Sequence, residues 1–329
     1  MYNITLFAAD NTMPSTLTGP MDVLSASGLL WGAISGKQPT PHFQLTLATE
    51  TGAPVACYNG LTLSTAASCM DIHQSDIILI PSLALGDQPL QLSDALVTWL
   101  QKMHQQGTVI ATVCTGAFVI AAAGLLDHRR ATTHWAYQES LQQQHPEIEV
   151  IADQILVDEG NIITSGGGSA WHDLVLYLIE RYVDAEAAVE ASKLFLLDRH
   201  IDTQTPYSFL CQSQPHSDLA ITRAQQWITQ NHTHSTALAG AIDVSGLSSR
   251  TFSRRFRQVT GMTPITFQQN LRLEDAKRQL ESTKSSVETI SINVGYDNVV
   301  SFRRLFKKRV GILPADYRKM FYDPQAAKQ

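Results

Sequence analysis

The feature of this sequence that most constrains its fold is a pattern that occurs twice in its last third. Phe252 and Phe256 lie four residues apart, and Phe302 and Phe306 repeat them 50 residues later. Aromatic residues at this spacing lie on one face of a helix and bury that face. Since strand-like runs of β-branched residues are absent from this region, we predict an all-α domain in which one unit is used twice.

A shorter apolar stripe and a glycine precede each phenylalanine helix. Leu238 and Ile242 lie one helical turn apart before Gly246, and residues 287–294 form a similar stripe before Gly295. Glycine reaches a positive φ at little steric cost, as a sharp turn between helices requires. A helix, a tight turn and a second helix form a helix-turn-helix, so we expect two such units in tandem.

The charge of the chain is divided unevenly along it. Residues 220–329 carry 17 Lys and Arg against 8 Asp and Glu, a net charge of +9, whereas residues 1–219 carry 7 against 22, a net charge of −15. Cations gathered in one domain attract phosphate groups, so the distribution favours nucleic-acid binding by the helical domain. A solvated basic face on one amphipathic helix is also common in proteins that never touch DNA, but the duplication favours recognition helices.

Residues 246–318, which begin GLSSRTFSRRF and end ILPADYR, resemble the AraC-type DNA-binding domain. The resemblance implies two helix-turn-helix subdomains joined by a long helix, here about Ile265 to Glu281. It also implies recognition helices held about 34 Å apart, which allows one chain to read two successive major-groove segments. The expected partner is double-stranded DNA at a promoter or operator.

The same resemblance assigns roles to residues of the two recognition helices. Arginine can bind guanine through two hydrogen bonds, whereas valine can only pack against a thymine methyl group. Phosphate contacts position a protein without specifying sequence. The expected base-reading residues are Arg250, Ser253, Arg254, Val299, Val300, Arg303 and Arg304, and the expected phosphate-binding residues are Arg257, Lys307 and Lys308.

The first part of the chain alternates short apolar runs with helical patterns. This alternation predicts an α/β fold with a parallel sheet. The expected strands are Ile4 to Ala8, Phe43 to Ala48, Asp76 to Pro81, Val109 to Val113, Gln154 to Val157 and Asn161 to Thr164, and the expected helices include Leu92 to Met103, Ala117 to Ala123 and Ala170 to Tyr182.

The segment TVCTGAFVIAAAGLL, followed by RRATTHW, resembles the PfpI-like branch of the class I glutamine amidotransferase superfamily. The resemblance covers roughly residues 1–195 and implies a flavodoxin-like parallel sheet sandwich. Ahead of an AraC-type domain, it resembles the GlxA-like regulators, whose members respond to amino acids, amines and quaternary amines. The whole chain is therefore expected to be a transcription regulator controlled by a small metabolite.

Cys114 is the centre of the expected ligand site. It lies where a strand turns into a helix, so the amides of Thr115 and Gly116 can stabilise a thiolate or bind an anionic group. The resemblance places His134 and Asp22 beside the cysteine.

Trp171, with Trp135 and His172 nearby, is expected to line the same pocket, because aromatic faces attract quaternary ammonium groups. Packing in the core is the alternative interpretation, and the sequence favours it for these rings over lining the pocket.

Catalysis by Cys114 is the alternative to ligand binding. The superfamily's Pro-Gly-Gly, which supplies an oxyanion-hole amide, reads Pro81-Ser82-Leu83 here, so acyl chemistry loses an expected donor. A regulator also needs its ligand to persist. We therefore expect a non-catalytic sensor, with a cysteine-dependent hydrolase or hydratase as the alternative. The four cysteines have no zinc-ligand spacing, and we expect neither a metal nor a cofactor.

The sequence divides into four parts. We predict a sensor and dimerisation domain over residues 1–197, a linker over 198–217, a DNA-binding domain over 218–322 and a tail over 323–329, with a homodimer formed by the first domain and RNA polymerase as a further partner. The uncharged stretch Thr108 to Leu126 contains glycines and threonines that indicate a buried strand, turn and helix, not a membrane span. No Lys or Arg precedes Lys37, so we do not expect an export signal. We expect a cytoplasmic location instead.

Overall fold

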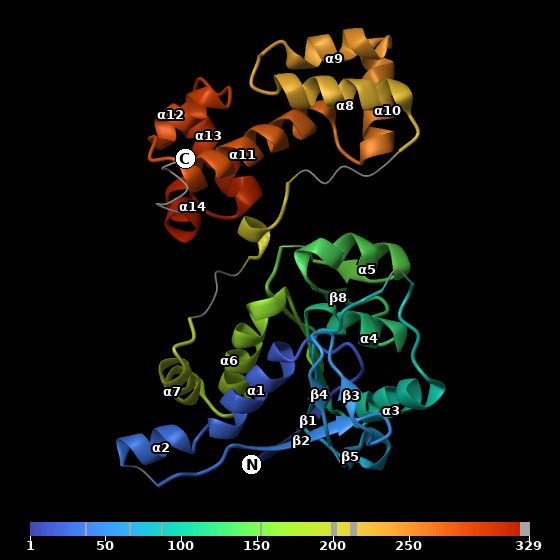
Figure 1. The fold of residues 1–329 in the computed structure, drawn as a ribbon, viewed down its shortest axis with the longest axis vertical. Helices are drawn as coiled ribbons and strands as arrows, with labels where there is room; N and C mark the ends of the chain where they lie inside the picture. The colour runs from blue at the N-terminus through green and yellow to red at the C-terminus, as the bar shows by residue number, and fades with distance from the viewer. Residues whose placement is uncertain are drawn as a thin grey trace. The chain divides into compact units, whose positions relative to one another are not determined.

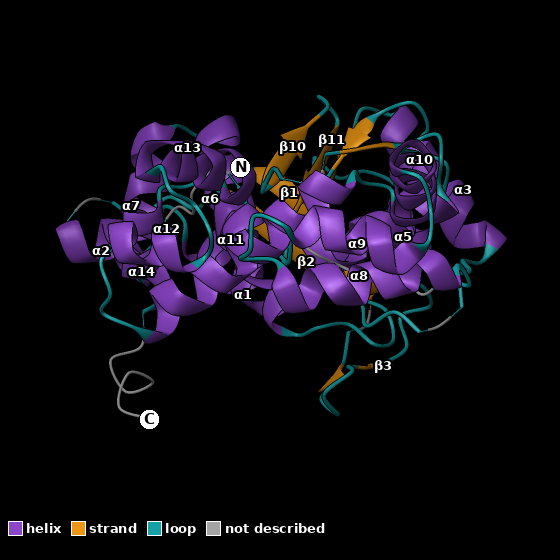
Figure 2. Cartoon of the chain, turned by 90° about the horizontal axis from the view of Figure 1, so that it is seen from above, coloured by secondary structure: helices purple, strands orange, loops and turns teal. Residues whose placement is uncertain are grey.

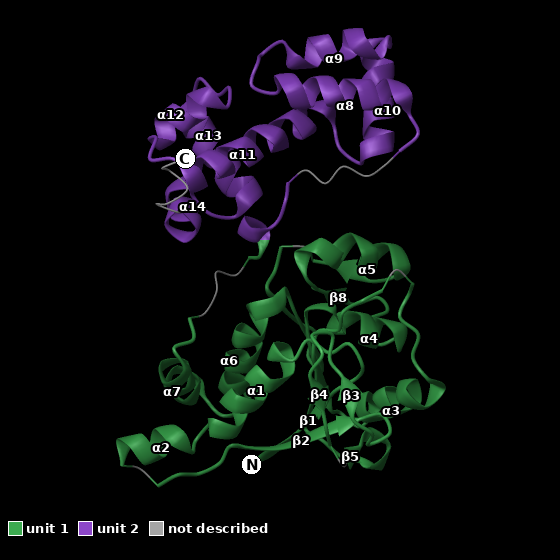
Figure 3. Ribbon diagram, viewed as in Figure 1, with its two compact units in different colours: residues 1–204 green, residues 205–329 purple. Residues whose placement is uncertain are grey.

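The computed structural model of the protein describes residues 1–36, 38–65, 67–86, 88–151, 153–198, 203–210 and 216–322. The chain forms two compact units, residues 1–204 and 205–329 (Figure 3). The division falls inside the stretch 198–217 that the sequence predicts as a linker. Residues 199–202 and 211–215 of that stretch, and the predicted tail 323–329, lie outside the described residues.

A seven-stranded sheet forms the centre of the first unit, in the order β10-β11-β7-β6-β1-β2-β5. Neighbouring strands pair in parallel except β10, which pairs antiparallel with β11. Every residue of β6, β7 and β11 is buried, which explains why these strands appear as continuous apolar runs. The strands are β1 (Tyr2–Phe7), β2 (Phe43–Thr49), β5 (Ala67–Ser68), β6 (Ile77–Ile80), β7 (Val109–Val113), β10 (Leu156–Asp158) and β11 (Ile162–Ser165).

Helices cover both faces of this sheet, as Figure 1 shows. One face packs against α1 (Ser15–Ala26), α6 (Trp171–Tyr182) and α7 (Ala185–Phe195), and the other against α3 (Asp94–Gln105), α4 (Ala117–Ala122) and α5 (Gln138–Gln144). The predicted parallel α/β sandwich is confirmed. The remaining elements are α2 (Leu30–Ser35), the two-stranded pairs β3 (Val55–Ala56) with β4 (Thr62–Leu63) and β8 (Arg130–Ala131) with β9 (Glu149–Val150), and short 3-10 turns η1 (Cys69–Asp71), η2 (Cys114–Gly116), η3 (Trp135–Tyr137) and η4 (Gly168–Ala170).

The uncharged stretch 108–126 has the structure that its glycines and threonines predict. It contains β7, the turn η2 and α4, and every residue of these elements except Ala122 is buried. Among the described residues, no helix is both long and apolar enough to cross a membrane.

The described residues of the second unit form helices joined by turns and loops, and the described strands, orange in Figure 2, belong to the first unit. Its two hydrophobic cores are separate. One lies among α8, α9 and α10, the other among α12, α13 and α14, and α11 contributes residues to both. After the turn η5 (Thr205–Tyr207), the helices are α8 (Leu219–Asn231), α9 (Ala237–Ser245), α10 (Ser249–Thr260), α11 (Pro264–Ser282), α12 (Val287–Asn293), α13 (Val299–Val310) and α14 (Pro314–Phe321).

The 50-residue repeat extends beyond the phenylalanines that reveal it in the sequence. Helices α10 and α13 each have 12 residues, and each ends at a left-handed glycine, Gly261 and Gly311. A proline begins the next helix in both copies. Gly246 and Gly295, at the turns, have φ values of +67° and +89°, as the turn interpretation requires.

The described part of the predicted linker is anchored to the folded units. Gln204 is only 4% exposed and belongs to the first unit. Leu210 donates its amide to the Glu274 carboxylate at 2.6 Å, and the Lys277 ammonium donates to the Ser208 carbonyl at 2.6 Å. Irregular polar sequence indicates the absence of a helix, but it does not indicate the absence of contacts.

Candidate functional site

The predicted base-reading surface of the first helix-turn-helix lies on α10. Arg250, Ser253, Arg254 and Arg257 are all exposed. The phenylalanines of the same helix are buried, so this helix has one apolar face and one cationic face. A helix of this kind can present its guanidinium groups to bases and phosphates while its other face stays packed.

One arginine of α10 serves the fold instead. Arg255 donates to the Asp218 carboxylate through Nε at 3.1 Å and Nη2 at 2.8 Å. Asp218 is also the N-cap of α8, because its side chain accepts from the amides of Ala220 and Ile221. Arg255 therefore fixes α10 against α8 and holds the cationic face in place.

The predicted base-reading surface of the second helix-turn-helix lies on α13. Val300 is 70% exposed, and Val299 is half-buried. Arg304, Lys307 and Lys308 are exposed. Arg303 is exposed too and donates to the Glu288 carboxylate of α12 at 2.5 Å. These helices bring together all ten residues predicted to contact DNA, in two groups on α10 and α13.

The second candidate site is the strand-to-helix elbow after β7. Cys114 has a φ of +57°, a conformation that costs strain for any residue with a Cβ. A side chain at Gly116 would lie 2.6 Å from the Pro81 carbonyl oxygen, so the end of β6 packs directly on the elbow. Cys114 itself is only 4% exposed. The elbow predicted from the sequence is present, but it is enclosed.

The amides that an oxyanion hole would use are already bonded within the protein. The Ser82 amide donates to the Thr16 hydroxyl at 2.9 Å, and the Leu83 amide donates to the Thr115 hydroxyl at 2.9 Å. The Thr115 hydroxyl in turn donates to the Leu83 carbonyl at 2.6 Å. Two buried threonines therefore occupy the amides of Ser82 and Leu83, the residues that stand where the superfamily has its Gly-Gly.

The Cys114 thiol is stabilised in its neutral form. Burial raises its pKa, and hydrogen bonding to Ser82, to Thr115 and to the His134 amide opposes this rise without cancelling it. A thiol is a weak nucleophile until it loses its proton. The elbow can therefore recognise a ligand by hydrogen bonding more readily than it can attack one.

His134 lies beside the elbow as predicted. The Thr133 hydroxyl, one residue before it, donates to the Cys114 carbonyl at 2.8 Å. The His134 ring packs on Gly167, where a Cβ would lie 2.7 Å from its Cδ2, and its Nδ1 accepts from the Ala136 amide at 3.0 Å. Burial lowers the pKa of His134, so the ring is neutral at pH 7. A neutral imidazole with one nitrogen already bonded has one ring nitrogen left for a ligand.

Trp171 lies on α6 and Asp22 lies on α1, two helices that pack against each other. The Trp171 indole packs on Gly19, where a Cβ would lie 2.5 Å from it. Gly19 lies one helical turn after Thr16, whose hydroxyl reaches the loop next to the cysteine. Asp22 is exposed, and it is not among the groups that perturb the Cys114 thiol. The expected place of Asp22 beside Cys114 is therefore wrong, and the α1 residue at that position is Thr16.

Gln204 is a site residue that the sequence does not reveal. Its side-chain oxygen accepts from the Trp135 amide at 3.0 Å, and its nitrogen donates to the Thr133 carbonyl at 2.8 Å. These two contacts lie on either side of His134. The residue immediately before the second unit therefore holds the loop that carries His134.

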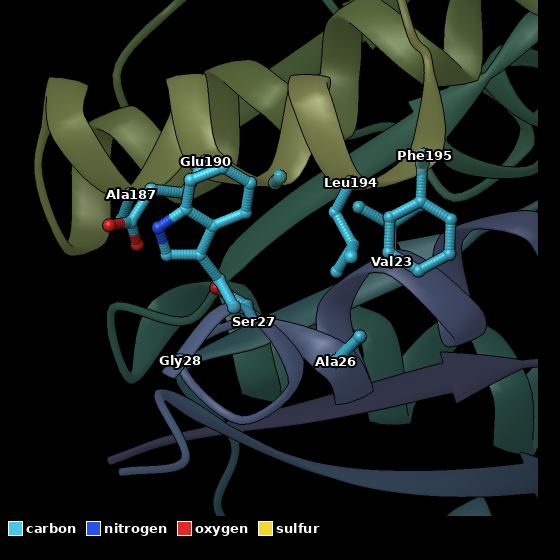
Figure 4. Close-up of a pocket in the computed structure, with 10 residues that line it drawn as sticks. Val23, Ala26, Ser27, Gly28, Ala187, Glu190, Leu194 and Phe195 are labelled. Atoms are coloured by element: carbon cyan, nitrogen blue, oxygen red, sulfur yellow. The ribbon is translucent and has the colours of Figure 1, made fainter. Parts of the chain in front are cut away.

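A separate pocket lies between α1 and α7 (Figure 4). It is lined by small and apolar side chains such as Val23 and Ala187, with Phe195 at one end. Its volume of about 10 Å³ accommodates no more than one water molecule. This pocket is too small for an organic effector.

The comparisons with known proteins agree with both halves of the structure. Residues 3–181 match the DJ-1/PfpI family, and residues 242–320 match a helix-turn-helix domain. The chain belongs to the DJ-1/PfpI family. The expected pairing of a PfpI-like domain with an AraC-type helix-turn-helix domain is confirmed.

The relatives of this chain include two proteins named as transcriptional regulators and one named as an enzyme. The chain is 30% identical over 271 residues to the HTH-type transcriptional regulator CdhR of Pseudomonas aeruginosa, covering 81% of this chain and 79% of that protein. It is 26% identical over 286 residues to the HTH-type transcriptional regulator GlxA of Rhizobium meliloti, covering 85% and 86%. It is also 33% identical over 173 residues to an isonitrile hydratase of Pseudomonas putida, covering 52% of this chain and 68% of the enzyme.

Proposed function

We propose that this protein is a sequence-specific DNA-binding transcription regulator whose N-terminal domain binds a small effector without converting it. The observation that carries the proposal is the pair of matched helices α10 and α13, each with a buried phenylalanine face and an exposed cationic face. Two relatives that align with most of this chain are named as HTH-type transcriptional regulators.

DNA binding by the full chain tests the first half of the proposal. The probe is a duplex that the wild-type protein selects from a random-sequence pool. Affinity should fall steeply with salt, because neutralised phosphates release counterions. Lys307→Ala should weaken all sequences about equally and reduce the salt slope by roughly 1.

Arg278→Ala is the matched control for this experiment. Arg278 is an exposed cation on α11, outside both recognition helices, and pairs with Asp275 at 3.2 Å. It should leave affinity and slope unchanged. Salt-independent binding by the wild-type protein would overturn the assignment.

The proposal of a non-catalytic sensor rests on the enclosed elbow. The Ser82 and Leu83 amides are bonded to threonines, and the Cys114 thiol is neutral. The ligand class that we propose is an amino acid, an amine or a quaternary ammonium compound, since aromatic faces attract such cations and His134, beside the elbow, and Trp171, at the start of α6, are aromatic residues that could contact one. A panel of these compounds, added to the full chain, should raise the unfolding temperature for a binder.

The isonitrile hydratase among the relatives favours one rival function, cysteine-dependent hydrolysis or hydration. Cys114→Ser separates the two. A sensor with this nearly isosteric change should keep its fold and its DNA affinity and alter only its response to the compound that stabilises it. An enzyme should convert that compound steadily and lose turnover by orders of magnitude in the variant. Steady product formation by the wild-type protein would exclude the pure sensor.

The assembly of the protein is part of the proposal. We expect a homodimer formed by the N-terminal domain, and contact with RNA polymerase at the promoter. Sedimentation of the full chain at several concentrations measures the first. Transcription in vitro from the selected site, with purified polymerase, measures the second.

A further inference from the structure

The two helix-turn-helix units lie within residues 205–329, where the first unit is α8 to α10 and the second unit is α12 to α14. Contacts besides their shared helix α11 are needed to fix their relative orientation. Their hydrophobic cores are separate, and α11 gives Phe267 to the first and Leu273, Ala276 and Leu280 to the second. The 19 residues of α11, about 28 Å of helix, run from one unit to the other (Figure 1). A single shared helix fixes a distance, but each unit could still tilt and turn where it packs on that helix.

Arg272, near the middle of α11, contacts both units at once. Towards the first unit, its Nε donates to the His232 carbonyl at 2.6 Å, and its Nη2 donates to the carbonyls of Thr233 at 3.2 Å and His234 at 3.3 Å. Towards the second unit, its Nη1 donates to the Gly295 carbonyl at 2.7 Å. One planar guanidinium therefore joins the loop after α8 to the turn between α12 and α13.

The two loops also touch each other at this point. A Cβ at Gly295 would lie 2.2 Å from the Thr233 carbonyl oxygen and 2.9 Å from the Arg272 Cζ. The turn of the second unit thus packs against the first unit through bare backbone, and only glycine permits this approach. Gln268, one turn earlier on α11, adds bonds to the His232 carbonyl at 2.8 Å and the His234 carbonyl at 3.1 Å.

The chemistry of this contact favours arginine over other cations. The carbonyls of residues 232–234 follow the C-terminus of α8, where backbone acceptors are left without helical partners and carry partial negative charge. A guanidinium offers five donors in a fixed plane, which suits acceptors on two sides. The Arg272 guanidinium also lies over the Tyr296 ring, 5.2 Å from its centroid, which restricts its orientation further.

The geometry points to Arg272 as the positioning residue that fixes α10 relative to α13, and so sets the number of base pairs that the protein requires between the two segments it reads. This inference rests on the proposed DNA-binding function and adds the spacing requirement to it. Each extra base pair would move the second segment by about 3.4 Å and turn it by about 35°. A rigid pair of units cannot follow that displacement, whereas a loosened pair can.

The test uses the full chain and the duplex selected by the wild-type protein, with one, two or three base pairs inserted between the two protected segments. Wild type should lose affinity steeply with each insertion. Arg272→Met should bind the uninterrupted site roughly tenfold more weakly, since hydrogen bonds from a charged group are lost, and its affinity should change much less with spacing. Arg272→Lys, a single donor centre in place of a fork, should behave in the same direction. Arg278→Met on the same helix is the control and should match wild type.

A half-site separates positioning from general destabilisation. A duplex that keeps only one protected segment should bind wild type and Arg272→Met equally, because each unit retains its own core. If the half-site affinity falls with the full-site affinity, or if the variant keeps the wild-type dependence on spacing, the inference is overturned.

A second variant covers the case in which Arg272→Met fails to fold. Gly295→Ala keeps the arginine in the sequence but puts a methyl group 2.2 Å from the Thr233 carbonyl oxygen and 2.9 Å from the Arg272 Cζ, so it displaces this contact and should flatten the spacing dependence in the same way. Failure of the proposed function itself has a different signature, since wild type would then select no site at all.

Discussion

Helices α10 and α13 are the same structural element with two different surfaces. Aligned at the 50-residue repeat, their buried positions carry the same residues, Phe252 with Phe302 and Phe256 with Phe306. Their exposed positions differ. Arg250 aligns with Val300, and Ser253 aligns with Arg303. The buried phenylalanines are therefore repeated, whereas most of the residues predicted to contact DNA are not.

The difference indicates that the two units read different base sequences. The first offers two arginines near its start, which suits guanine, and the second begins with two valines, which suits thymine methyl groups. Arg254 and Arg304 are the exposed pair that the repeat keeps identical. The predicted site is therefore bipartite and asymmetric, with one element in common.

The largest expected effect comes from truncating the buried phenylalanines that α10 and α13 have in common. Phe256→Ala and Phe306→Ala should each lower the free energy of unfolding by about 3–5 kcal/mol, because each ring is fully buried in its own core. Hydrogen exchange of the full chain should show lost protection mainly in α8 to α10 for the first variant and in α12 to α14 for the second.

The exposed variants Ser253→Ala and Lys308→Ala serve as controls and should leave exchange unchanged. Equal loss of protection in α8 to α10 and in α12 to α14, from either phenylalanine variant, would show that the two helix-turn-helix units unfold together. Their separate cores would then not give them separate stabilities.

The next effect concerns the position that the repeat keeps. Arg254→Ala and Arg304→Ala should each cost about 1–3 kcal/mol of DNA-binding free energy and relax base preference at one position. The two relaxed positions should lie in different halves of the selected site. Repeating the selection from the random pool with each variant measures this. Relaxation of the same half by both variants would contradict the assignment of one unit to each half.

The helical half of the protein was predictable because its information is periodic and repeated. The phenylalanine spacing, the turn glycines and the basic faces all follow from residues within 20 positions of one another. The Arg272 contacts were not predictable, since an arginine on an amphipathic helix has no sequence mark that distinguishes a backbone clamp from a solvated charge.

The cysteine site was predictable only where it is contiguous in sequence. The elbow at 114–116 and the nearby His134 follow from the strand-to-helix pattern and the family resemblance. Thr16, Ser82 and Gln204 come from three distant segments and share no spacing with the cysteine. Asp22 and Thr16 lie six residues apart on α1, which is not a whole number of turns at 3.6 residues per turn, so only the packed structure decides which of them faces the elbow.

A smaller effect tests the apolar start of α13. If Val300 packs on a thymine methyl, replacing that thymine by uracil should cost wild type about 0.8 kcal/mol, the value of one buried methyl-sized group. Val300→Ser should bind the thymine and uracil duplexes equally. The same base change in the half read by α10 is the control and should not distinguish the two proteins. A uracil effect that persists in Val300→Ser would assign the methyl contact to another residue.

The smallest effect concerns the ion pair between Arg303 and Glu288 in the second helix-turn-helix. Arg303 is paired with Glu288, whereas the residue that aligns with Glu288 in the first helix-turn-helix, when the turn glycines Gly246 and Gly295 are matched, is the uncharged Ala239. The pKa of Glu288 is lowered, first by its backbone hydrogen bond at the start of α12 and then by Arg303. Since the folded pKa lies below the unfolded one, the stabilisation is fully present at neutral pH and is lost only as pH falls through the folded value.

Glu288→Gln should therefore release Arg303 at neutral pH. We expect a slight loss of stability and a slight gain in DNA affinity, smaller than the effect of either arginine deletion, because exposed ion pairs contribute little. Titration of the selected duplex at two salt concentrations measures the gain, which should be larger at low salt. Asp316→Asn removes a carboxylate from a comparable exposed pair with Lys319 on α14. An equal gain from both variants would mean that affinity follows net charge alone. A gain confined to Glu288→Gln would mean that the second unit meets DNA with an arginine that must first leave its partner, a step that the first unit does not share.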